Sequence, residues 1–69
     1  MVTLEDIFNA IFDAEENYGA EYVSVAINNK KLFVMYNNNA VNTFDYDENI
    51  DIKKVNELCN YLSLKFIGE

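Results

Sequence analysis

The densest run of side chains that could bind a metal ion is the segment 45–51, Asp-Tyr-Asp-Glu-Asn-Ile-Asp. Its carboxylate and amide oxygens recur at alternate positions, as they do at the start of an EF-hand calcium loop. The rest of that pattern is missing, because Ile50 stands where glycine is required and Asn56 where a bidentate glutamate is required. The segment is therefore interpreted as a solvated connection that supplies acids to a helix N-terminus, and no metal site is predicted.

Side chains suited to catalysis are scarce in this chain. There is no histidine, and a single cysteine, Cys59, forms neither an intrachain disulfide nor a zinc site. Cys59 falls between Leu58 and Asn60 on an apolar helical stripe, which is typical of a buried structural thiol. The adjacent carboxylates Glu15 and Glu16 do not share a helix face, so they make a poor catalytic pair. The sequence predicts a protein that is not an enzyme and has no catalytic residue, cofactor or metal.

The charge balance is the most unusual property of the composition. Twelve acidic residues face five lysines and no arginine, which gives a formal charge of −7. Such a chain is repelled by nucleic acid and by anionic membranes and attracted to basic proteins, although acidity also simply keeps small proteins soluble. The expected partner is a basic protein or ribonucleoprotein complex, with no direct contact to nucleic acid or membrane.

The chain length and the distribution of apolar residues predict a single small domain, 1–69. The hydrophobic fraction of 51% is sufficient for a core. No stretch approaches the roughly 18 apolar residues that a membrane span requires. The first residues lack the basic region of a signal peptide, so a cytoplasmic location is expected.

Apolar residues recur at helical spacing in two segments. The first stripe consists of Leu4, Ile7, Phe8, Ile11 and Phe12. The second consists of Ile52, Val55, Leu58, Cys59 and Leu62. Thr3 is suited to cap the first helix, which is expected to end at Asn17 or Gly19. Asn49 or Asp51 is suited to cap the second helix.

Three strand-like runs lie between the helices, at 21–28, 31–36 and 41–46. Asparagine-rich segments separate them, and asparagine tolerates the positive φ of tight hairpin turns. With a two-residue loop at 29–30, three apolar pairs would fall on one sheet face, whereas a slip of one residue would scatter them. These pairs are Ile27 with Leu32, Val25 with Val34, and Val23 with Tyr36.

The second hairpin and the last residues allow more than one arrangement. A two- or four-residue loop would place Val41 on the same face as Tyr36, and a three-residue loop would place Val41 and Thr43 on the opposite face. Residues 64–67 form either the end of the second helix or a short fourth strand. The predicted fold is α+β: an N-terminal helix, a three-stranded antiparallel meander and a C-terminal helix.

The sheet face opposite the predicted core also carries large apolar residues. Its expected members are Tyr22, Ala26, Phe33, Met35, Phe44 and Tyr46. Three arrangements would explain such a face: a helix packed on each side of the sheet, a homodimer, or contact with a foreign partner. The small size of the chain favours a helix on each side, because a small domain needs the buried area.

The acidic residues fall into two groups along the chain. The first is Asp13, Glu15, Glu16 and Glu21, and the second is Asp45, Asp47, Glu48 and Asp51. In a meander these groups lie toward opposite ends of the sheet, which predicts a spread acidic surface. Carboxylates spaced on a rigid body are able to imitate nucleic-acid phosphates and to occupy a basic groove.

In length, acidity and order of elements, the chain resembles the small phage-encoded anti-CRISPR and anti-restriction proteins. The resemblance covers the whole chain at the level of layout, and no motif matches, so no residue role is transferred. It implies an inhibitor in the host cytoplasm that blocks a nucleic-acid-handling protein, such as a CRISPR effector, by DNA mimicry. The alternative is a small adaptor or homo-oligomerisation module that uses the aromatic sheet face.

Overall fold

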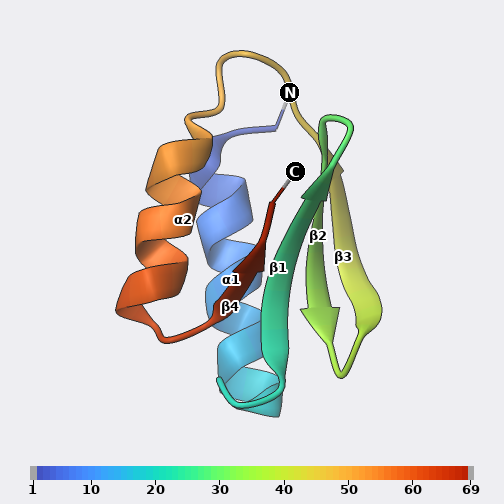
Figure 1. The fold of residues 1–69 in the computed structure, drawn as a ribbon, viewed down its shortest axis with the longest axis vertical. Helices are drawn as coiled ribbons and strands as arrows, with labels where there is room; N and C mark the ends of the chain where they lie inside the picture. The colour runs from blue at the N-terminus through green and yellow to red at the C-terminus, as the bar shows by residue number, and fades with distance from the viewer. Residues whose placement is uncertain (1, 69) are drawn as a thin grey trace.

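A computed structural model describes residues 2–68 and has the helix–meander–helix order expected from the sequence (Figure 1). Its elements are α1 (Leu4–Tyr18), β1 (Val23–Asn28), β2 (Lys31–Tyr36), β3 (Asn39–Asp45), α2 (Ile52–Tyr61) and β4 (Lys65–Ile67). The strand order is β3-β2-β1-β4, and β4 runs parallel to β1 while the other neighbours are antiparallel. The α+β prediction is confirmed, and the last residues form the short strand.

Helix α1 begins and ends at residues suited to those positions. The Thr3 side chain accepts a hydrogen bond from the backbone N–H of Asp6, whose carboxylate accepts one from the Thr3 backbone, so the capping box is complete. Gly19, with a φ of 87°, ends the helix. The predicted stripe was wrong for Phe12, which is 42% exposed. Smaller side chains complete the buried face, which consists of Ile7, Ala10, Ile11 and Ala14.

Helix α2 follows the predicted stripe closely. Asp51 is the N-cap, and its side chain accepts a hydrogen bond from the backbone N–H of Lys53 at 3.0 Å. Val55 and Cys59 are fully buried. The other three stripe residues, Ile52, Leu58 and Leu62, are partly buried against the same core.

The first hairpin has the predicted register. Asn29 and Lys30 both have positive φ, 52° and 62°, as the two central residues of a type I′ turn require. The three apolar pairs expected from the sequence all form, and they place the alternating residues of β1 and β2 on the core side.

The second hairpin contains an irregularity that alternation alone does not predict. Its loop is also two residues long, with Asn37 and Asn38 at positive φ. The register between β2 and β3 then shifts between Val34 and Met35, which leaves Val41 without an opposite residue. Val41 is therefore a β-bulge, and it reverses the faces of all later β3 residues.

This bulge corrects the predicted positions of Phe44 and Tyr46. Without it, a two-residue loop would point both side chains to the face opposite the core. With it, Phe44 lies opposite Leu32, a fully buried residue, and both aromatic side chains pack against the core. The prediction that they belong to the opposite face was wrong.

Both helices lie on the same side of the sheet (Figure 1). The buried residues of α1, α2, β1 and β2 form one cluster, so a single sheet face serves both apolar stripes. The expected arrangement with a helix on each side was wrong, because the two helices also pack against each other and share one layer. Within residues 2–68, neither helix has the length and apolar character needed to cross a membrane.

Candidate protein interface

The two groups of acidic residues lie at opposite ends of the sheet. Glu15 and Glu16 are in the last turns of α1 and Glu21 precedes β1, so they gather at the lower end in Figure 1. The second group begins at Asp45, the last residue of β3, and leads into α2, at the upper end. Asp13 lies on the exposed side of α1 between them. All eight are exposed except Glu15, which is half-buried.

Few of these carboxylates are neutralised by a lysine. Asp45 accepts a hydrogen bond from Lys31 Nζ at 2.8 Å, and it is the only carboxylate of residues 2–68 in an ion pair. Both side chains of this pair are well exposed, so it contributes at most about 1 kcal/mol. Asp47 and Asp51 instead accept backbone N–H bonds within their own segment. The negative potential of the first group is therefore largely uncancelled, whereas the charge of the second group is partly offset by lysines at the same end, Lys30, Lys31, Lys53 and Lys54.

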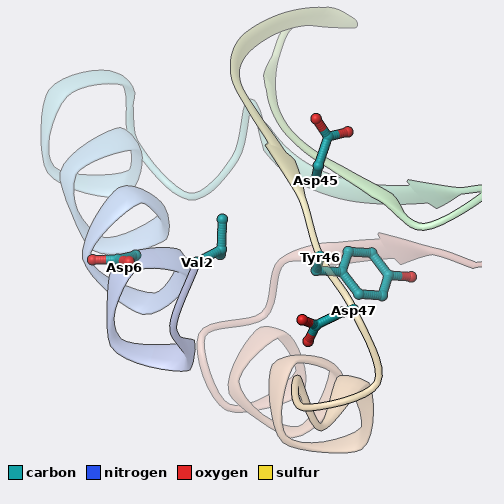
Figure 2. Close-up of a pocket in the computed structure, with 5 residues that line it drawn as sticks. All are labelled: Val2, Asp6, Asp45, Tyr46 and Asp47. Carbon is teal, nitrogen blue, oxygen red and sulfur yellow. The ribbon is translucent and has the colours of Figure 1, made fainter.

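The structure adds Asp6 to the second acidic group. An open depression lies between the start of α1 and the end of β3 (Figure 2), and it is lined by Val2, Asp6, Asp45, Tyr46 and Asp47. Figure 2 shows the three carboxylates pointing in different directions rather than toward one point. Accordingly, no group of three His, Cys, Asp or Glu side chains within residues 2–68 is placed to hold a metal ion. In the sequence, Asp6 is recognisable only as a residue of the first helical turn, and no sequence signal places it at the same depression as the end of β3.

The sheet face turned away from the helices, termed the open face, keeps part of the predicted aromatic set. Phe33, Met35 and Ala26 lie on it and are half-buried by their neighbours in the sheet. Strand β4 extends it, because Ile67 pairs with Ala26 and is exposed. The open face consists of Ser24, Ala26, Asn28, Lys31, Phe33, Met35, Ala40, Thr43, Asp45, Lys65 and Ile67.

Three tyrosines from different parts of the chain meet at the lower end of the molecule. The Tyr18 and Tyr36 rings stack with centroids 4.2 Å apart, and the Tyr22 ring meets Tyr36 edge-on at 6.3 Å. Tyr18 is 41% exposed and Tyr22 is 54% exposed. Tyr22 belongs to the predicted interface set, whereas Tyr18 was missed. Tyr18 lies four residues after Ala14, on the buried side of α1, and this helical spacing is the sequence signal that would have identified Tyr18.

Cys59 has the structural environment predicted for it. Its side chain is completely buried between α2 and the sheet. This burial disfavours the thiolate and raises the pKa of Cys59 to about 11. The thiol is therefore protonated at neutral pH, which is the opposite of the shift that activates a nucleophilic cysteine.

Comparisons with protein-family models, with curated proteins and with solved structures found no match to this chain. The resemblance in layout to phage inhibitors therefore stays a prediction. Any function has to be inferred from the exposed carboxylates, the open face and the tyrosines.

Proposed function

We propose that this chain is a non-enzymatic inhibitor that occupies the basic surface of a nucleic-acid-handling protein in the cytoplasm, such as a CRISPR effector. A phage or mobile element would be its natural source. The main support is that eight exposed or half-exposed carboxylates surround the molecule, and only Asp45 among residues 2–68 is paired with a lysine. A basic groove would be attracted to this surface as it is to phosphates.

The dimensions of the molecule are compatible with imitation of a short duplex. Its longest axis measures 29 Å, and the two acidic groups lie at the two ends of that axis (Figure 1). At about 3.4 Å per nucleotide of each strand, this length corresponds to roughly eight base-pair steps. A groove that holds such a stretch of nucleic acid would therefore contact both groups at once. No bond-making step is needed for inhibition of this kind.

The test is affinity capture with the tagged protein from a lysate of the host cells. We expect a nucleic-acid-handling protein to be retained at low salt and released near 1 M salt, where the Debye length falls to about 3 Å. Added duplex DNA should compete with the tagged protein, because both would occupy one groove. Capture of such a protein that DNA does not reduce would contradict mimicry, and so would its absence at low salt.

A second candidate function is an adaptor or homo-oligomerisation module that uses the open face. The observation that favours it is that Phe33, Met35 and Ile67 are not covered by either helix. A dimer would bury this apolar surface, which a monomer leaves in contact with water.

Phe33→Asp is expected to convert such a dimer to a monomer, because it would bury an unpaired carboxylate at the centre of the interface. Multi-angle light scattering at high protein concentration measures the change. Tyr61→Asp is the matched control, since Tyr61 is 84% exposed on α2, away from the open face. A wild-type protein that stays monomeric throughout the concentration series would eliminate the homo-oligomerisation module.

A further inference from the structure

The tyrosine cluster, defined as Tyr18, Tyr22 and Tyr36, has the properties of an interface anchor. Its rings come from α1, the connection before β1, and β2, and they hold one another by stacked and edge-on contacts. Tyr18 and Tyr22 nevertheless keep much of their surface in solvent. Rigid, amphipathic tyrosine rings are enriched among the residues that dominate binding energy in protein interfaces.

The charges beside the cluster select the type of side chain that it would bind. Glu21, Tyr22 and Lys65 line the same open depression. Glu15 is one helical turn before Tyr18, on the same side of α1. Together with Glu16, these groups give the lower end of the molecule a net negative charge, so a cation is favoured over an anion or a neutral group.

Aromatic faces next to carboxylates are better matched by arginine than by lysine. The planar guanidinium stacks on a tyrosine ring and at the same time donates two parallel hydrogen bonds to a carboxylate. An ammonium group is more strongly hydrated and has no plane to stack. We propose that the tyrosine cluster and Glu21 bind an arginine side chain presented by the basic protein partner. This inference rests on the proposed function and names the contact that would anchor it.

An NMR titration with three blocked pentapeptides tests the site directly. The peptides are Gly-Gly-Arg-Gly-Gly and its lysine and citrulline counterparts. We expect the arginine peptide to shift resonances of Tyr18, Tyr22 and Glu21 in a saturable manner. The lysine peptide should bind about two- to fivefold more weakly, because an ammonium group neither stacks on the ring nor donates two parallel hydrogen bonds to the carboxylate. The citrulline peptide, which is neutral, should not bind.

Matched variants distinguish binding of the arginine peptide at this site from general attraction of a cationic peptide to an acidic protein. Tyr22→Ala and Glu21→Gln should each weaken the arginine peptide about two- to fivefold. Tyr61→Ala and Glu57→Gln, which change exposed residues of α2, should leave its affinity unchanged. Tyr22→Phe keeps the ring and should keep the binding. Lys65→Ala removes the competing positive charge and should strengthen it.

The possible outcomes distinguish this inference from the proposed function. Equal shifts with the arginine and lysine peptides, unaffected by Tyr22→Ala, would overturn the arginine site and leave electrostatic inhibition standing. A confirmed arginine site in a protein that captures no nucleic-acid-handling partner would instead overturn the proposed function. If Tyr22→Ala loses the native NMR spectrum, the folded variants Tyr22→Phe and Glu21→Gln decide the question, and unchanged binding in Glu21→Gln would count against the site.

Discussion

Reversing the charge of four exposed acidic residues is expected to weaken binding to a basic partner by about 100-fold, with the fold retained. The four are Asp13, Glu16, Glu21 and Glu48. Their side chains make no hydrogen bond or ion pair to residues 2–68, so lysine at these positions breaks no cap or turn. Each replacement adds two units of charge, which changes the formal net charge from −7 to +1. Attraction to a basic groove then becomes weak repulsion.

Titration calorimetry against the captured partner, at low and at high salt, measures this effect. A variant with amides at the same four positions has a formal charge of −3 and should show an intermediate loss. Thermal unfolding of both variants serves as the control for folding. If the lysine variant binds as tightly as the wild type, electrostatic mimicry is not the mode of action of this protein.

Phe44→Ala is expected to lower the free energy of unfolding by about 2 kcal/mol, a large share of the stability of a small domain. The bulge at Val41 places Phe44 opposite the fully buried Leu32, on the core side of the sheet. Phe44 packs against the core and is partly buried, so removing its ring loses burial worth roughly 1.5 kcal/mol or more and leaves a cavity.

Urea denaturation measures the stability change. Thr43→Ala is the matched control, because the neighbouring Thr43 is exposed and lies on the open face. It should cost less than about 1 kcal/mol. If Phe44→Ala costs no more than Thr43→Ala, Phe44 does not lie on the core side of the sheet.

Local sequence patterns were sufficient to predict those features of the fold that depend on residues close together in the chain. The limits of α1 follow from Thr3, Asp6 and Gly19, since caps and left-handed positions are properties of a few adjacent residues. The register of the first hairpin follows from its two-residue turn, because the turn type sets the strand alignment. The position of the two acidic groups at opposite ends of the sheet follows from the meander order alone.

Tertiary structure decided the features that depend on packing between distant segments. The bulge at Val41 leaves no trace in the alternation of β3, because either face assignment provides apolar residues for the core. Both apolar stripes are compatible with either side of a sheet, so the shared layer of α1 and α2 was not predictable from their spacing. The tyrosine cluster and the depression that Asp6 and Asp45 both line also arise from this packing. Composition and order along the chain determined that this protein is acidic and α+β, and three-dimensional packing determined which of its side chains meet.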